Sequence, residues 1–173
     1  GLGLPLALGR CCLAALPQEQ ITQIQPFPVR MAAVNAVLQP LGLRFPAPGE
    51  CLAQGGWRLC WAGRETGFVL GGAAPAGLRA HAAVGDQSDG WAGLRLEGED
   101  CVDVLARLVP LDLRPASFAP GSSLRAPLKQ MPALFVRVSG QTFDIFVFRS
   151  MVETAVEELT GAMRGVAARC APA

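Results

Sequence analysis

The chain has 173 residues, of which 51% are hydrophobic and only 17% are charged, with 15 basic residues against 14 acidic ones. A chain of this length forms one domain and has no room for two catalytic domains, and its balanced charge without a basic stripe argues against nucleic-acid binding. The low charge content favours a surface that a partner covers, although the many Ala and Gly residues raise the hydrophobic fraction by themselves. Residues 1–8 are apolar but end before Arg10, which is too short for a membrane span and lacks the basic start of a signal peptide, so we interpret them as a strand.

The first half of the chain is expected to contain one helix and one hairpin. Residues 31–41 repeat apolar side chains at helical spacing. Pro28 precedes this helix and Pro40 ends it, because proline fits a first turn but interrupts the later hydrogen bonds. Residues 57–61 and 66–70 read as two strands joined by a short turn.

The second half of the chain is expected to contain a strand, a helix, a hairpin and a last helix. Residues 92–96 alternate as a strand, and residues 101–108 have the apolar spacing of a helix with acidic residues in its first turn. Residues 134–138 and 143–148 flank a Ser-Gly-Gln turn and give the strongest hairpin signal. Ser150, three residues before a glutamate, has the pattern of a capping box that opens a last helix.

The order of these elements predicts the fold class. Strands and helices do not alternate as in a doubly wound fold, and tight hairpins require antiparallel pairing. We therefore expect an α+β fold, as a single domain over residues 1–173, with an antiparallel sheet and flanking helices.

The six cysteines lack the Cys-x-x-Cys spacing of zinc and thioredoxin-like sites. We interpret them as buried small hydrophobic residues of a reducing compartment, which favours the cytoplasm. A bridge between Cys11 and Cys12 is the alternative, and adjacent cysteines are poorly placed for it.

Few residues suggest chemistry. His81 is the only histidine, so a structural role is favoured over catalysis, and the glycine-rich residues 71–75 lack the spacing of a phosphate-binding loop. The acidic residues between positions 86 and 103 could pair as catalytic carboxylates, but a solvated strand end and helix start is the simpler interpretation. Three tryptophans could stack on a pterin or flavin ring, although core positions are commoner for Trp57, Trp61 and Trp91.

Residues 86–158 resemble the first domain of the aminomethyltransferases, which move a one-carbon unit between an amine and tetrahydrofolate. The similarity covers a strand, a glycine and an acid-headed helix at residues 89–101, a helix end followed by Asp112, a turn at residues 119–121 and the paired strands at 134–148. It implies the folate-binding type of fold, with a core of about residues 57–169.

Over most of its length the chain is more similar to the gamma subunits of heterotetrameric sarcosine oxidase. The shared motifs include Pro-Phe-Pro at residues 26–28, Asp-Gln-Ser-Asp-Gly-Trp at 86–91, Leu-Asp-Leu-Arg-Pro at 111–115 and Phe-Arg-Ser at 148–150. The marker residues that the similarity singles out are Asp89, Trp91, Asp112, Arg114, Arg149 and Ser150.

One departure separates the chain from the aminomethyltransferases. They carry a catalytic aspartate in a glycine-rich turn just before the strand that begins here at Leu134, whereas residues 129–133 read Lys-Gln-Met-Pro-Ala. The resemblance thus implies the fold without the carboxylate that would hold the reacting amine.

The resemblance implies a non-catalytic subunit, with no catalytic, cofactor-binding or metal residue of its own. Its expected partners are the alpha and beta subunits, with the small delta subunit as a further candidate, and those partners would hold FAD, FMN, NAD and tetrahydrofolate while sarcosine is demethylated to glycine. Nucleic acid and membrane are not expected partners. The alternative is a separate tetrahydrofolate-binding module that uses the three tryptophans, and an independent aminomethyltransferase is disfavoured by the missing aspartate.

Overall fold

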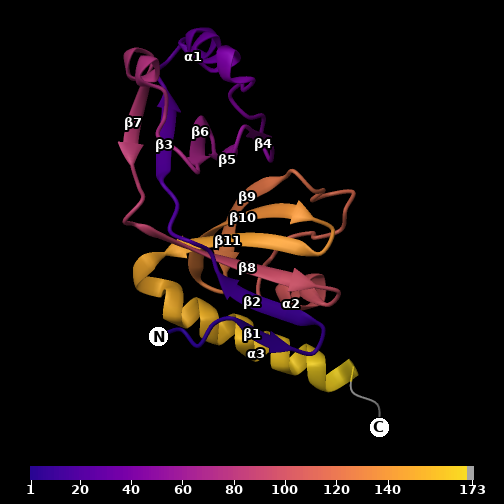
Figure 1. Ribbon diagram of the computed structural model, residues 1–173. Coiled ribbons are helices and arrows are strands. Elements are labelled where there is room, and N and C mark those ends of the chain that lie inside the picture. Colours follow the sequence, from indigo (N-terminus) through magenta and orange to yellow (C-terminus); the bar gives the residue numbers. More distant parts are fainter. Residues whose placement is uncertain (171–173) are drawn as a thin grey trace.

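The computed structural model describes residues 1–170, which form two antiparallel sheets with α-helices at their outer faces (Figure 1). The α+β class and the antiparallel pairing are confirmed, but the strands form two sheets where the sequence suggested one. The large sheet has the order β1-β2-β8-β11-β10-β9, with β1 (Leu6–Leu8), β2 (Cys11–Ala15), β8 (Trp91–Gly98), β9 (Ser123–Leu128), β10 (Met131–Ser139) and β11 (Thr142–Phe148). The small sheet has the order β4-β5-β6-β3-β7, with β3 (Ile21–Pro26), β4 (Cys51–Gln54), β5 (Trp57–Gly63), β6 (Thr66–Leu70) and β7 (Ala82–Asp86).

The central strands of the large sheet are buried on both faces, which explains their nearly continuous apolar sequence. In β10, Ala133 and Phe135 pack on one side of the sheet, while Leu134 and Val136 pack on the side that faces the small sheet. β10 pairs with β11 across the tight turn near Gly140, so the hairpin that the sequence predicted is confirmed.

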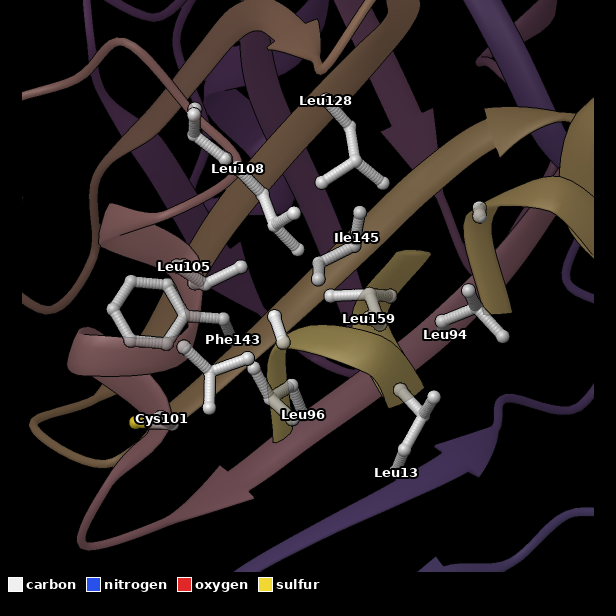
Figure 2. Packing of buried hydrophobic residues seen from close by; sticks show 14 of the residues in the cluster. Leu13, Leu94, Leu96, Cys101, Leu105, Leu108, Leu128, Phe143, Ile145 and Leu159 are labelled. Carbon is white, nitrogen blue, oxygen red and sulfur yellow. The ribbon is translucent and has the colours of Figure 1, made fainter. Parts of the chain in front are cut away.

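Two helices cover the outer face of the large sheet. They are α2 (Cys101–Ala106) and the long α3 (Val152–Cys170), which runs beneath the strands in Figure 1. Leu159 of α3 is fully buried among side chains such as Leu96 and Ile145, and Figure 2 shows this cluster at close range. Burying one such leucine stabilises the fold by roughly 1.5–3 kcal/mol, so α3 is an integral part of the core.

The small sheet carries its own helical cover at the far end of the molecule from α3 (Figure 1). This cover consists of α1 (Met31–Leu38), the 3-10 turn η1 (Gln39–Leu41) and the 3-10 turn η2 (Ala76–Ala80). Val34 and Leu38 of α1 are fully buried against Ile24 and Leu59 of the sheet. Of the helices in the described part of the chain, none combines the length and apolar character that crossing a membrane requires.

Several boundaries differ from the sequence-based expectation. The strand expected over residues 1–8 is limited to β1, and the helix expected over residues 31–41 ends at Leu38, where Pro40 changes it to a 3-10 turn. Strands β2, β3, β4 and β7 were not expected at all. The limits proposed for an aminomethyltransferase-like core, residues 57–169, stay a prediction.

The prediction of a capping box at Ser150 is wrong. Helical backbone already begins with the 3-10 turn η3 (Arg149–Met151), and α3 continues from it at Val152. A capping residue has to lie before the first turn, whereas Ser150 lies exposed inside it. Among the described residues, no side chain caps η3.

Candidate functional site

Three of the six marker residues meet where the β7–β8 turn approaches the end of β11. Arg149 donates from Nε to the carbonyl oxygen of Asp89 at 2.9 Å, and from Nη2 to those of Trp91 at 2.9 Å and Ser88 at 3.3 Å. Its backbone N–H also donates to the carbonyl oxygen of Gly90 at 2.9 Å. Arg149 therefore fastens this turn to η3, which is a structural task.

The Trp91 side chain lies between the two sheets and is only 4% exposed. Its ring packs against Phe148 at 4.6 Å and edge-on against Phe68 at 5.5 Å between centroids. The guanidinium of Arg125 lies over the Trp91 ring at 5.2 Å, and partial burial lowers the pKa of Arg125. Trp91 is thus a core aromatic residue that joins the sheets.

Two further markers, Asp112 and Arg114, form an exposed ion pair in the loop after α2. The Asp112 carboxylate accepts from Arg114 Nε at 2.8 Å and from the Ser117 hydroxyl at 2.7 Å. These donors hold the pKa of Asp112 well below its usual range. The pair shapes the loop locally, in the manner of an Asx turn.

Arg137 fixes the same loop after α2 through hydrogen bonds to its backbone. This residue of β10 is 2% exposed and its guanidinium donates to four backbone carbonyl oxygens, with donor–acceptor distances from 2.6 to 3.2 Å. It also stacks over the Phe143 ring at 5.0 Å. A buried arginine that is satisfied by carbonyl groups fixes an irregular loop without offering a charge to a substrate. The four acceptors belong to Leu113, Phe118, Ser139 and Gly140.

A buried carboxylate lies between the sheets. Asp144 of β11 is 0% exposed, and it accepts from Arg58 Nη1 of β5 at 2.5 Å and from Arg95 of β8 at 2.7 and 3.0 Å. Arg58 also pairs with Glu19 at 3.0 Å. The group links a strand of the small sheet to two strands of the large one, and sequence analysis missed it. Its signal was an aspartate inside the apolar run of residues 143–148, which requires buried cationic partners.

An open hollow of about 540 Å³ adjoins this group, lined in part by Glu19, Gly56, Trp57 and Arg58. The two charged side chains in its wall are paired with each other. A ligand here would have to displace that pair and would remain open to solvent, unlike the largely enclosed sites of small molecules.

The three tryptophans do not converge on one site. Leu59 packs toward α1, and side chains two positions apart share a face of a strand, so Trp57 and Trp61 lie on the α1 side of the small sheet. Trp91 lies on the opposite side, between the sheets. These residues therefore do not fit a shared stacking site for tetrahydrofolate.

The turn where aminomethyltransferases carry their aspartate is short here. Lys129 and Gln130 connect β9 to β10, and Lys129 adopts a left-handed backbone with φ of 57°. The Lys129 backbone N–H donates to the carbonyl oxygen of Leu108 at 2.7 Å, and its Nζ lies 3.8 Å from the Glu158 carboxylate of α3. The turn is fixed by its own contacts and carries no carboxylate.

The remaining titratable candidates are dispersed. His81 follows η2 and its Nδ1 is buried without a hydrogen-bond partner among residues 1–170. Of the acidic residues between positions 86 and 103, Asp86 accepts from Ser88, while Glu99 and Asp100 both bind Arg10. In the described part of the chain, no group of three or more His, Cys, Asp and Glu side chains is placed to hold a metal ion.

The interpretation of all six cysteines as thiols is wrong. Cys51 of β4 and Cys60 of β5 lie directly opposite each other and form a disulfide, which the spacing-based argument could not find because the pairing arises from the hairpin register. Among residues 1–170 the free cysteines are Cys11, Cys12, Cys101 and Cys170. Burial raises the pKa of Cys11 to about 11, so its thiol is unreactive.

Comparison with known proteins finds related structures. No protein-family model matches the chain. No curated protein gives a significant sequence match. A chain of the heterotetrameric sarcosine oxidase from Corynebacterium sp. U-96, solved in complex with pyrrole 2-carboxylate, matches with a TM-score of 0.81 and 25% sequence identity, over 98% of this chain and 91% of that one.

A second solved structure shares the fold at lower similarity. The glycine cleavage system aminomethyltransferase T from Bartonella henselae matches with a TM-score of 0.61 and 14% identity, over 91% of this chain and 47% of the enzyme. The chain thus spans about half the length of that enzyme. The aminomethyltransferase-like fold expected from the sequence is confirmed by both structures.

Proposed function

Because the chain belongs to a sarcosine oxidase subunit family, we propose that it is the non-catalytic gamma-type subunit of a heterotetrameric sarcosine oxidase. In this role it supports the assembly of the complex that oxidatively demethylates sarcosine to glycine. The observation that carries the proposal is the extent of the similarity, which covers 98% of this chain and 91% of the matched oxidase chain. Two chains of nearly equal length and the same fold are suited to the same place in an assembly.

The polar chemistry of the chain supports a structural role. The Asp144 carboxylate is occupied by two arginines, and the Arg137 guanidinium is occupied by backbone carbonyl groups. The turn at residues 129–130 lacks the carboxylate that an aminomethyl transfer would need. Catalytic groups have to remain available to a substrate, and these charges are committed to contacts within the chain.

The proposal assigns the redox and one-carbon chemistry to the partners. FAD, FMN, NAD and tetrahydrofolate would be held by the alpha and beta subunits, and the small delta subunit would complete the assembly. A one-domain chain without a phosphate-binding glycine loop is poorly suited to any flavin or NAD site of its own. The cytoplasm remains the location proposed for the complex, although the Cys51–Cys60 disulfide removes the argument from reduced cysteines.

Co-expression tests the proposal. The chain should purify in a stoichiometric complex with a tagged alpha subunit from the same organism, and the complex should oxidise sarcosine with release of hydrogen peroxide. The purified chain alone should show no sarcosine oxidation, no flavin absorbance and no transfer of a one-carbon unit to tetrahydrofolate.

Omission of the chain is the control. Without it, the alpha, beta and delta subunits should be less soluble or melt at a lower temperature, because apolar interface would be exposed to water. If the alpha, beta and delta subunits were as stable and as active without this chain as with it, the assembly role would be refuted.

A further inference from the structure

The Cys51–Cys60 disulfide lies at the edge of the small sheet. β4 is the outer strand of that sheet, and the bond joins its first residue to the residue directly opposite on β5. Cys60 is 0% exposed and belongs to the apolar cluster between the two sheets, against which Cys51 packs. The bond therefore ties the start of an edge strand to the space between the sheets.

The residues beside this bond also connect the two sheets. Glu50 pairs with Ser122 in an isolated antiparallel bridge, and the Cys51 N–H donates to the carbonyl oxygen of Gly121 at 2.8 Å. The buried Ser123 hydroxyl, at the start of β9, donates to the carbonyl oxygen of Glu50 at 3.0 Å. β9 is the last strand of the large sheet, so these contacts cover the start of an edge that would otherwise be open.

Side-chain packing contributes little to holding β4 in place. The first two of its four residues are only half-buried and the last two are exposed, so the strand buries little apolar surface. The turn to β5 consists of Gly55 and Gly56, with φ of 56° and 82°, and supplies no side chain to pack. Closing a loop of about ten residues with a disulfide favours the closed arrangement roughly a hundredfold in the chain-entropy model. The disulfide is therefore a main restraint on this strand.

The other cysteines indicate that the chain does not use its thiols as a disulfide framework. Among residues 1–170, Cys11, Cys12, Cys101 and Cys170 are free. Small domains that depend on disulfides usually pair their cysteines throughout, whereas a disulfide in a reducing compartment is usually transient and redox-sensing. A bond at an edge strand can open locally while the rest of the fold persists.

We propose that Cys51 and Cys60 form a redox switch, which a small thiol such as glutathione opens and the corresponding small disulfide closes. Residues 49–54, which we call the switch segment, are fixed against β5 and β9 in the disulfide state. In the dithiol state they detach from β9, whose edge is then uncovered, while the large sheet keeps its structure. This inference concerns bonds within the chain, so it does not depend on the proposed function.

The exchange consumes two small thiols. The thiolate of the first attacks the sulfur of Cys51, which is half-buried, whereas Cys60 is fully buried. A mixed disulfide forms, and Cys60 leaves as a thiolate and takes up a proton. The thiolate of the second attacks the small-thiol sulfur of the mixed disulfide and releases Cys51, which is also protonated. The protein disulfide is reduced to two thiols, and the two small thiols are oxidised to one disulfide.

Hydrogen exchange of the full-length chain in glutathione buffers tests the switch. At each ratio of reduced to oxidised glutathione, alkylation and mass spectrometry give the fraction of chains that hold the disulfide. Reduction should speed amide exchange about ten- to a hundredfold in the switch segment and at Ser123, whose N–H donates to the carbonyl oxygen of Gly49 at 2.9 Å. Residues 131–148 of β10 and β11 should keep their exchange rates, and oxidised glutathione should restore slow exchange in the switch segment.

Two variants complete the experiment. Cys51→Ala should show fast exchange in the switch segment in both oxidising and reducing buffer, with no further response to glutathione. Cys12→Ser replaces a half-buried free cysteine of β2 and should respond to glutathione as the unchanged chain does. The comparison of the two redox states of the unchanged chain decides the question even if Cys51→Ala does not fold.

Three results would overturn the switch. A bond that stays oxidised in the folded chain at every glutathione ratio, and is reduced only in denaturant, is a permanent structural disulfide. A bond that is reduced without faster exchange in the switch segment is not what fixes that segment. Equally faster exchange over residues 131–148 means that reduction unfolds the whole chain.

Discussion

Replacing Asp144 with Asn should strongly destabilise the chain without altering its shape. The substitution removes a fully buried negative charge and leaves the guanidinium groups of Arg58 and Arg95 opposite each other. Removing one partner of a buried ion pair costs about 3–5 kcal/mol, chiefly because the remaining charge is left uncompensated.

The arginines are not fully buried, and this lowers the expected loss. Their side chains retain 20% and 36% exposure, so water can hydrate them after the carboxylate is gone. We therefore expect the free energy of unfolding to fall by about 2–4 kcal/mol for Asp144→Asn. For a chain of this size that corresponds to a melting temperature lower by roughly 4–16 °C.

Urea unfolding followed by tryptophan fluorescence measures the loss, since Trp91 reports on the space between the sheets. Asp112→Asn is the matched control, because it removes the carboxylate of an exposed pair and should leave the urea midpoint close to that of the unchanged chain. Equal urea midpoints for the two variants would refute the view that Asp144 joins the sheets. Asp144→Leu combined with Arg58→Met and Arg95→Met should recover part of the loss, because the carboxylate and both guanidinium groups are removed together, while Glu19 loses its pairing with Arg58.

Three further predictions concern the loop, the last helix and the cysteines. Arg137→Met should lower the free energy of unfolding by about 2–4 kcal/mol, because it leaves four carbonyl groups without their side-chain donor. It should also allow chymotrypsin to cleave after Phe118, and a loop that stays protected from the protease would contradict this. Ser150→Ala should change stability by less than about 0.5 kcal/mol, and a loss near 1–2 kcal/mol would restore the capping box. A thiol reagent in denaturant should titrate four thiols before reduction and six after it, and six thiols without reduction would disprove the Cys51–Cys60 bridge. In the native chain Cys11 and Cys101 should react after Cys12 and Cys170, because both are buried and burial raises their pKa.

The features that the sequence could predict depend on local patterns. The hairpin of β10 and β11 has two apolar runs and a short turn, and α2 has apolar residues at helical spacing, so each element is specified within about fifteen residues. The α+β class follows from such elements alone. The resemblance to an oxidase subunit likewise rested on short motifs, of which the Asp112–Arg114 pair proved to be a local turn.

The features that the sequence could not predict depend on distant pairing. β7 has the sequence Ala-Ala-Val-Gly-Asp, which has little strand preference of its own. It forms a strand because it pairs with β3, where Thr22 lies opposite Asp86. The same pairing defines β3, whose Thr and Gln residues read as a polar loop in isolation. Long-range register, which decides both strands, has no local signature.

The arrangement of charge also explains why the candidate residues form structural groups. Asp144 meets Arg58 and Arg95 across 86 and 49 residues of sequence. The Arg95 contact requires the pairing of β8 with β11, and the Arg58 contact requires the stacking of the two sheets. The charged residues that the sequence motifs single out, such as Asp112 and Arg149, stabilise turns through their hydrogen bonds. Burying a charge is unfavourable unless it is paired, so a chain that pairs its buried carboxylate internally has used its polar interior to hold two sheets together.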